Sequence, residues 1–405
     1  SYQSSSFLFP PHSQYYAPRR EMNDTEFTQI GAESFANFYV PNAIDDRYDT
    51  SFPLGMGAYG EVMLLGCSNS SRKPIAIKKF TEPFRDEKRA QRCFRELQLL
   101  REIDHENIVK MRFTYSTEDS VDDLKSIYLG ADFAGNDLQT YIAEETETGK
   151  QTFTLRDFKK MISELLRALK YLKSVNVMHR DLKPGNLAIG NNNKLSLLDF
   201  GLARVMDEGN AMTSGPGTRY YVAIETVAFG DRTVPQIYNE KADIWSIGAI
   251  LYEMLTGKIL FEASNSTLKA IEICGPIPDN VMSSIFEQIV HKSIRDSLLK
   301  RSNSAIRIDF IDCPVRGLRS QARPWLQGEI SANIEQLRDF FDRTLVFDHE
   351  MRMTIDEALA YDFLSEVREI DKETTASHSI EDYGNASIDE WKRRIWDIIQ
   401  ANPVE

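Results

Sequence analysis

The sequence is poor in the features that mark secreted, membrane and nucleic-acid-binding proteins. Its 405 residues include only four cysteines, too scattered for a disulfide framework or a paired metal site, which favours free thiols in a reducing compartment. No apolar run approaches the roughly 18 residues of a membrane-spanning helix. Basic residues are outnumbered by acidic ones: 48 Lys and Arg against 61 Asp and Glu give a net charge of −13. This charge argues against a general nucleic-acid binder.

The rest of the composition is that of a globular protein. Hydrophobic residues make up 42% and charged residues 27% of the chain, and the length suits two lobes around a cleft. The beginning is different, because residues 1–20 are rich in Ser, Tyr and Pro and contain no apolar signal-peptide core. We expect residues 1–45 to form a disordered N-terminal extension, with residues 35–40 as the part able to pack on the folded body.

A glycine-rich turn joins two strand-like runs at residues 52–62, which read FPLGMGAYGEV. Because Gly55, Gly57 and Gly60 lack side chains, the backbone can approach phosphate oxygens closely. The same glycine spacing occurs in dinucleotide-binding folds, where a helix follows it. Here residues 62–65 (VMLL) continue as a strand, which favours a hairpin that covers a nucleotide.

The next strand and helix offer an ion pair. Residues 74–79 (PIAIKK) alternate so that Ala76 and Lys78 share one face of a strand. Glu96 lies in a segment with helical periodicity. We expect Lys78 and Glu96 to form a pair that positions the α- and β-phosphates of a nucleotide. The alternative is a surface lysine and an exposed glutamate, worth about 0–1 kcal/mol.

Two short motifs carry the chemistry. An amphipathic helix expected over 154–174 leads to residues 179–186, which read HRDLKPGN, and residues 199–201 read DFG. Two carboxylates, a lysine and an amide in this order are what phosphoryl transfer to a hydroxyl requires. Asp181 is the expected general base, Lys183 the expected contact of the γ-phosphoryl group, and Asn186 and Asp199 the expected ligands of Mg²⁺.

These motifs in this order resemble a eukaryotic protein kinase, and within that family the stress-activated, p38-like group of MAP kinases. The resemblance covers roughly residues 40–398 and includes a tail, 388–392 (IDEWK), that in MAP kinases packs back on the small lobe. It implies a two-lobed α+β fold, with a small antiparallel sheet plus one helix and a large, mainly helical lobe. The implied divisions are a kinase domain at 48–364 (small lobe 48–134, large lobe 135–364) and a C-terminal extension at 365–405.

The resemblance also implies ATP and Mg²⁺ as cofactors. The positions that match the family's nucleotide-binding residues are Leu54, Gly55, Gly57, Gly60, Val62, Ala76, Lys78, Ala131, Asp137 and Leu198. Ala131 matches the gatekeeper behind the adenine, where a methyl group would leave room for bulky inhibitors. Asp137 matches a ribose-binding position, with a helix cap as the alternative. His179 is expected to pack in the catalytic loop and takes no part in the chemistry.

The activation segment departs from the family. Thr213 fits the threonine of the Thr-x-Tyr motif, with Ser214 as a competing acceptor, but Gly215 stands where the tyrosine should be. One of the two arginines that receive the phosphotyrosine is also replaced, by Val222. We expect the second phosphorylation to be absent and Thr213 to be the activating site. The same Val222 predicts a weakened preference for proline after the target Ser or Thr.

The receptor for a phosphothreonine is complete in the sequence. Arg92 and Arg95 stand one turn apart on the helix of Glu96, and Arg180 lies in the catalytic loop. These positions match the arginines that gather the phosphate in relatives. Solvated helix arginines are the alternative for the first two.

Partners follow from the resemblance. Glu369, Asp371 and Glu373 match the acidic docking patch that binds basic motifs of activators and substrates, although Lys372 interrupts it and a solvated face is the alternative. The region 275–325 is longer and more basic than in relatives. We expect a monomer in the cytoplasm or nucleus, with protein substrates, an upstream MAP kinase kinase, and neither nucleic acid nor membrane as partners.

The sequence therefore predicts a serine/threonine protein kinase of a MAP-kinase-type cascade. A kinase-fold signalling scaffold with little turnover is the alternative, and the altered activation segment favours it. Against it stands the catalytic set, because a pseudokinase usually lacks Lys78, Asp181 or Asp199. A small-molecule kinase is less favoured, since Thr218 matches a threonine of the platform for protein substrates.

Overall fold

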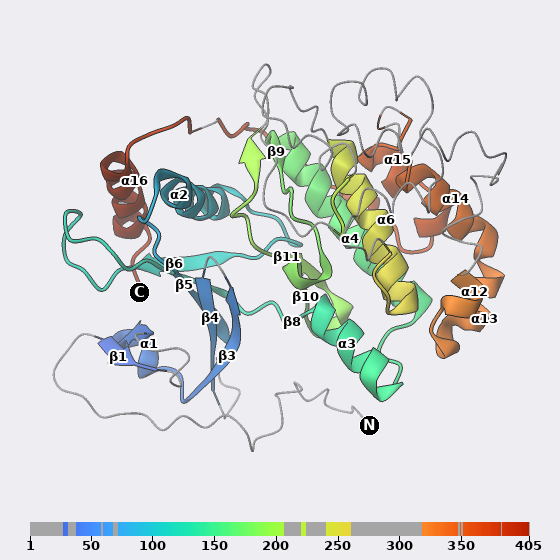
Figure 1. The fold of residues 1–405 in the computed structure, drawn as a ribbon, viewed down its shortest axis with the longest axis horizontal. Coiled ribbons are helices and arrows are strands. Elements are labelled where there is room, and N and C mark those ends of the chain that lie inside the picture. Colours follow the sequence, from blue (N-terminus) through green and yellow to red (C-terminus); the bar gives the residue numbers. More distant parts are fainter. Residues whose placement is uncertain are drawn as a thin grey trace, which may run out of the picture. The chain divides into compact units, whose positions relative to one another are not determined.

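The computed structural model describes residues 27–30, 38–57, 60–67, 72–205, 220–223, 240–260, 318–346, 349, 351–381 and 383–404. The chain divides into two compact units. The first comprises Ser1–Arg101, Lys110–Phe133 and Gly384–Glu405, and the second comprises Glu102–Val109 and Ala134–Tyr383 (Figure 1). Among the described residues, no helix is long and apolar enough to cross a membrane.

The first unit is built on a five-stranded antiparallel sheet. Its strands, in spatial order, are β3 (Thr50–Gly57), β4 (Gly60–Gly66), β5 (Ile75–Phe80), β7 (Tyr128–Asp132) and β6 (Met111–Tyr115). The two longer helices described in the same unit are α2 (Glu87–Glu102) and α16 (Ile388–Ala401). The predicted small lobe of antiparallel sheet plus helix is confirmed.

The strand register gives the sheet two different faces. Met63 lies opposite Ile77, and Leu65 lies opposite Ile75; all four side chains belong to one buried hydrophobic cluster. Because side chains alternate along a strand, the neighbouring residues point to the other face. Lys78 is among these neighbours, and its strand partner across the ladder is Val62.

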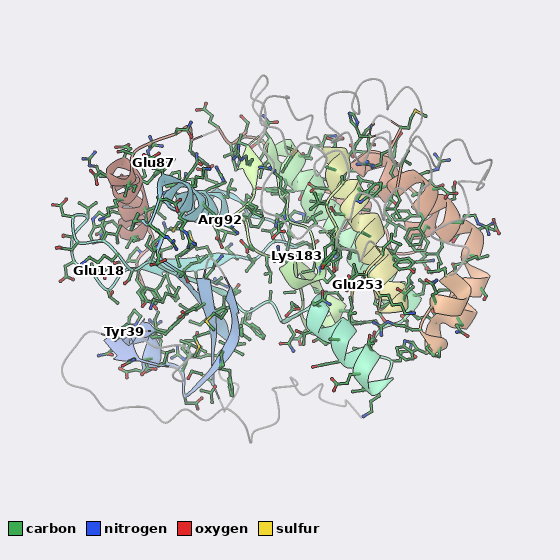
Figure 2. The ribbon with its side chains drawn as sticks, in the orientation of Figure 1. Tyr39, Glu87, Arg92, Glu118, Lys183 and Glu253 are labelled. Atoms are coloured by element: carbon green, nitrogen blue, oxygen red, sulfur yellow. The ribbon has the colours of Figure 1, made fainter. Side chains whose placement is uncertain are left out.

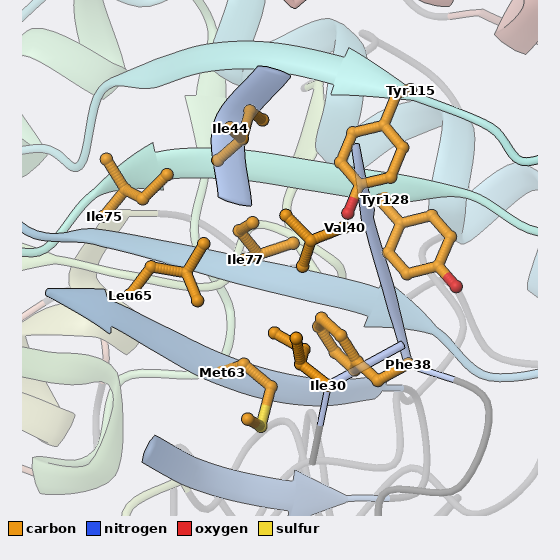
Figure 3. Close-up of a cluster of buried hydrophobic side chains, with 10 residues drawn as sticks. All are labelled: Ile30, Phe38, Val40, Ile44, Met63, Leu65, Ile75, Ile77, Tyr115 and Tyr128. Atoms are coloured by element: carbon orange, nitrogen blue, oxygen red, sulfur yellow. The ribbon is translucent and has the colours of Figure 1, made fainter. Parts of the chain in front are cut away.

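The N-terminal segment covers the hydrophobic face (Figure 3). It contains β1 (Phe27–Gln29), paired antiparallel with β2 (Tyr39–Pro41), and α1 (Asn42–Asp45). Phe38 stands edge-on to Tyr128, with ring centroids 5.6 Å apart, and the Tyr115 hydroxyl donates to the carbonyl of Tyr39 over 2.7 Å.

The packing of residues 38–40 on the sheet agrees with the expectation for residues 35–40, but the prediction of disorder up to residue 45 is wrong for residues 27–30 and 41–45. The polar composition of the first 20 residues does not continue into this segment. Phe38, Val40 and Ile44 are buried against the sheet, and this apolar area offsets the entropy lost on ordering the segment.

The C-terminal helix packs on the same unit, as predicted. Trp391 of α16 is buried and lies 5.1 Å from the ring of Phe94 on α2, measured between centroids. Ser387 caps the helix by accepting a hydrogen bond from the backbone N–H of Glu390. Beyond the helix, the carbonyl of Asn402 accepts a hydrogen bond from the N–H of Thr114 over 2.8 Å.

The second unit is mainly helical, as predicted. Its described helices are α3 (Leu138–Thr148), α4 (Leu155–Ser174), α6 (Glu240–Thr256), α12 (Leu318–Gln321), α13 (Gln327–Ala332), α14 (Ile334–Thr344) and α15 (Ile355–Leu359). Its short strands are β8 (Asn136–Asp137), β9 (Val177–Met178), β10 (Leu187–Ile189), β11 (Leu195–Leu197) and β12 (Arg204–Val205).

Helix α4 is the long amphipathic helix expected over 154–174. It begins with a capping box, in which Thr154 and Asp157 each bond the other's backbone N–H. It ends at Ser174, and β9 follows within three residues. The helix therefore delivers the chain directly to the segment that begins at His179.

Replacing Phe38 with Ala tests the cover of the sheet. Phe38 is fully buried, so we expect the free energy of unfolding in urea to fall by about 3–5 kcal/mol. The control is Asp46→Ala, an exposed position of the same segment, which should change it by less than about 0.5 kcal/mol. Equal, small effects of both substitutions would mean that the segment does not contribute to the fold.

Candidate active site

Lys78 and Glu96 form the predicted ion pair within the first unit. Nζ of Lys78 lies 2.5 Å from Oε1 of Glu96, and the two side chains are 16% and 4% exposed. Strand β5 turns Lys78 away from the hydrophobic cluster, and α2 presents Glu96 on its buried side. Such low exposure sets this pair apart from the surface ion pairs that contribute little to stability.

The glycine-rich turn connects β3 and β4, with Ala58 and Tyr59 outside the described residues. A Cβ atom at Gly60 would lie 2.8 Å from the carbonyl oxygen of Lys79, so packing itself requires glycine there. A Cβ atom at Gly55 or Gly57 would meet nothing within 4 Å. The open space beside these two glycines allows the backbone to approach phosphate oxygens closely.

The catalytic-loop residues form a compact cluster in the second unit, where Figure 2 labels Lys183. Oδ2 of Asp181 accepts hydrogen bonds from Nζ of Lys183 over 2.8 Å and from Nδ2 of Asn186 over 2.9 Å. The same Nδ2 donates to the backbone carbonyl of Asp181 over 2.8 Å. Asp181 and Asn186 are both buried, so Asn186 fixes the loop and the orientation of the carboxylate together.

His179 has the packing role that was expected. It is fully buried, with its Nε2 2.9 Å from the carbonyl of Leu198 and its ring edge-on to Phe200. The N–H of Asp181 donates to Nδ1 over 3.4 Å. Burial lowers the pKa of His179, so the ring is neutral with its proton on Nε2. The histidine holds both motifs and has no free nitrogen for proton transfer.

The strands β10 and β11 bring Asp199 toward the loop. The N–H of Leu198 donates to the carbonyl of Asn186 over 2.9 Å, so the residue before Asp199 is bonded to the loop's last member. Asp199 has a φ of +53°, and its Oδ1 accepts a hydrogen bond from the N–H of Gly201. A non-glycine residue in this region of φ is uncommon and requires support from its surroundings.

The chemistry of Asn186 and Asp199 fits Mg²⁺. The amino group of Asn186 is bonded to Asp181, which leaves the amide oxygen as its ligand atom, and Asp199 supplies carboxylate oxygens. Mg²⁺ takes oxygen ligands and usually only one or two protein carboxylates, with phosphates and water completing its shell.

The arginines that are expected to receive a phosphothreonine belong to two different units. Arg92 (labelled in Figure 2) and Arg95 lie on α2 of the first unit, and Arg180, with a φ of +68°, lies in the second. A small hollow in the first unit is lined by Phe80, Thr81, Pro83, Arg89, Arg92, Cys93 and Glu96. Thr213 lies outside the described residues, so its role stays a prediction.

Sequence reasoning missed two features of this region. Arg204 of β12 pairs with Met178 of β9, which lies two positions before Arg180. The position of Arg204 shortly after the DFG motif could have indicated that it lies near the catalytic loop. Tyr221 is buried, and its hydroxyl donates to Glu253 on α6 over 2.6 Å. Two adjacent tyrosines gave no sign of which one is buried.

The remaining nucleotide-site predictions have mixed outcomes. Asp137 caps α3, since its carboxylate accepts hydrogen bonds from both the N–H and the hydroxyl of Thr140; this was the alternative, and the ribose contact stays a prediction. Ala131 is buried in β7 opposite Ala76, so two small side chains share that part of the sheet. Leu54 is exposed.

The predicted docking residues lie after α15. Glu369 and Glu373 are bonded to basic residues of their own chain, and the side chain of Glu373 is only 4% exposed. Glu373 is therefore not presented to a partner. Asp371 is exposed.

Comparison with known proteins agrees with this geometry. The protein kinase domain family matches residues 48–364. Mitogen-activated protein kinase pmk-3 of Caenorhabditis elegans is 32% identical over 369 residues, which span 89% of this chain and 73% of the relative. Mitogen-activated protein kinase 12 of Mus musculus is 33% identical over 351 residues (85% and 86%), and mitogen-activated protein kinase 13 of Homo sapiens is 32% identical over 358 residues (87% and 88%).

Two buried histidines give the second unit a pH dependence. Burial lowers the pKa of His105 to about 4, and its Nδ1 accepts a hydrogen bond from the N–H of Asn107. Between pH 4 and 6.5 the unfolded chain therefore binds a proton at His105 that the folded chain does not. The lowered pKa of His179 acts in the same direction. The free energy of unfolding should fall as the pH falls from 6.5 to 5, by up to about 1.4 kcal/mol per pH unit from His105 alone.

Urea denaturation at pH 7.5, 6.5, 5.5 and 5 measures how the free energy of unfolding changes with pH. This range lies above the pKa values of about 4 that are usual for carboxylates. His105→Asn keeps an acceptor near Nδ1 but cannot be protonated, so its slope should be shallower than that of the wild type. An identical slope in the variant would show that His105 does not titrate on unfolding.

Proposed function

The chain belongs to the MAP kinase family of the protein kinases, and from this premise we propose how its own residues carry phosphoryl transfer. It is a serine/threonine protein kinase that uses ATP with Mg²⁺. Lys78, held by Glu96, binds the α- and β-phosphates. Asp181 and Lys183 act at the substrate hydroxyl and the transferred group.

A single observation supports this assignment most strongly: one carboxylate oxygen of Asp181 accepts two hydrogen bonds. Oδ2 accepts from Lys183 and from Asn186, which orients Oδ1 as the acceptor for a substrate hydroxyl proton. Lys183 sits beside the same carboxylate, where it can stabilise charge on the phosphoryl group. Asn186 and Asp199 would hold Mg²⁺, which neutralises charge on the phosphates when bound.

Regulation by an upstream kinase is proposed to act on Thr213 alone. Gly215 has no hydroxyl, and Val222 removes a cation that a phosphotyrosine would need. Arg92, Arg95 and Arg180 are proposed to receive the phosphothreonine, with Arg204 as a further cation of the second unit. We also propose that the kinase works as a monomer in the cytoplasm or the nucleus.

Asp181→Asn tests the catalytic role. The amide keeps the shape but accepts no proton, so we expect transfer of labelled phosphate from ATP to a generic basic protein to fall by about 10²–10⁴-fold. The enzyme is first incubated with a MAP kinase kinase. Asp339→Asn, which neutralises a half-exposed carboxylate on α14, is the control and should retain full activity.

Thermal unfolding and ATP binding of the Asp181 variant should match the wild type, since the substitution leaves the fold intact. Transfer at the wild-type rate would reject Asp181 as the base. A wild-type protein that binds ATP but transfers nothing would favour the scaffold.

Thr213→Ala tests the single-site activation. After incubation with the upstream kinase, the wild type should carry one phosphate in this segment, at Thr213, and gain activity. The variant should stay at its basal rate, because no phosphate reaches the arginines. Ser214→Ala is the matched control and should be activated normally; the reverse pattern would move the site to Ser214.

A further inference from the structure

Phe80 lies beside Lys78 on the face of the sheet that is turned away from the hydrophobic cluster. It is the last residue of β5, two positions after Lys78, so the two side chains share one face of the strand. Nζ of Lys78 lies over the ring of Phe80, 5.1 Å from the ring centroid. This distance is within the roughly 6 Å at which an aromatic face attracts a cation.

The ring of Phe80 is held firmly by its surroundings. Phe80 is 6% exposed, and its backbone N–H donates to the carbonyl of Ile127 over 3.0 Å. Across the ladder between β4 and β5 it lies opposite Gly60 of the glycine-rich turn. Because a buried side chain in a close-packed sheet keeps one rotamer, the face of the ring stays turned to Lys78.

The aliphatic part of Lys78 is held by Gly60. A Cβ atom at Gly60 would lie 3.2 Å from Cε and 3.3 Å from Cγ of Lys78, so the lysine chain runs close to the backbone of β4. Its Nζ reaches both the ring of Phe80 and the carboxylate of Glu96. Phe80 and Glu96 also line the same small hollow beside α2, which places the ring and the carboxylate near each other.

These two contacts of the ammonium group differ in charge. Glu96 supplies a full negative charge, whereas the face of the Phe80 ring supplies only the negative potential of its π electrons. A second carboxylate in this place would repel the α- and β-phosphates that Lys78 is proposed to bind. The ring attracts the ammonium group without adding an anion. Because the side chain of Lys78 is only 16% exposed, the attraction is stronger than at an open surface.

We propose that Phe80 is a positioning residue of this kinase. The face of its ring keeps the ammonium group of Lys78 at Glu96, in the place where it meets the α- and β-phosphates of ATP. The proposal rests on the proposed function, because Phe80 has this task only if Lys78 binds those phosphates.

Transfer of labelled phosphate to a generic basic protein tests the task. Phe80→Leu keeps a large apolar side chain but removes the ring face, so kcat/KM for ATP should fall about three- to tenfold while KM for the protein substrate stays unchanged. Phe113→Leu is the matched control. Phe113 belongs to β6 of the same sheet but packs against the hydrophobic cluster, so this substitution should leave kcat/KM for ATP unchanged.

Fluorination separates the electrostatics of the ring from its packing. Each fluorine added to the phenyl ring at position 80 weakens the negative potential of the ring face and changes its size very little. Mono-, di- and trifluorophenylalanine should therefore lower kcat/KM for ATP step by step, while the thermal midpoint stays close to that of the wild type. A residue with a packing role alone would give the wild-type kcat/KM throughout the series.

A double-mutant cycle measures the contact without turnover. Lys78→Met keeps the length of the side chain but removes its charge, and both single variants and the double variant are unfolded in urea. Phe80→Leu should raise the equilibrium constant of unfolding about three- to tenfold more when Lys78 is present than when it is replaced. This result does not depend on catalysis.

Any of three results overturns the proposal. These are an unchanged kcat/KM for ATP in Phe80→Leu, an unchanged kcat/KM throughout the fluorinated series, and additive effects of Phe80→Leu and Lys78→Met on unfolding. A coupled cycle in a protein that transfers no phosphate would instead refute the proposed function, on which the task of Phe80 depends.

Discussion

The amide of Asn186 is the contact on which the catalytic loop depends. It donates to the backbone carbonyl and to the carboxylate of Asp181, five residues earlier. The loop is thereby closed on itself in a region where residues such as Arg180 have positive φ and would not hold their conformation alone. His179 adds a second tie, to the carbonyl of Leu198. The hydrogen bonds of the buried Asp181 and His179 side chains thus make the loop rigid.

In the first unit, the two faces of strand β5 position the ion pair of Lys78. The alternation of β5 places Ile75 and Ile77 in the hydrophobic cluster and Lys78 on the other face, so packing of one face orients the chemistry of the other. The N-terminal segment covers the packed face, and α16 lies against α2, which carries Glu96. The ion pair between Lys78 and Glu96 therefore rests on segments from both ends of the chain.

Much of this could be predicted from the sequence because motifs are local. The helix at 154–174 follows from the periodicity of its apolar residues. The pairing of Lys78 with Glu96 and the packing of His179 follow from the resemblance of local motifs to those of protein kinases. The failures concern contacts between distant residues. The packing of Ile30 and Ile44 depends on a sheet whose strands come later in the chain. The burial of the Glu373 side chain depends on α4, where its partner Lys170 is 203 residues away in sequence. Charge patterns alone do not reveal which carboxylates are already paired.

The composition of the first unit has a consequence for synthesis. Trp391, Asn402 and Val404 all pack in it, so its packing cannot be complete until residues 391–404 have left the ribosome. The second unit consists of chain that emerges earlier and can fold while the tail is still being made. A truncated product would thus carry the loop of Asp181 but an unfinished support for α2. In this protein, translation beyond α16 is therefore a condition for completing the support of α2.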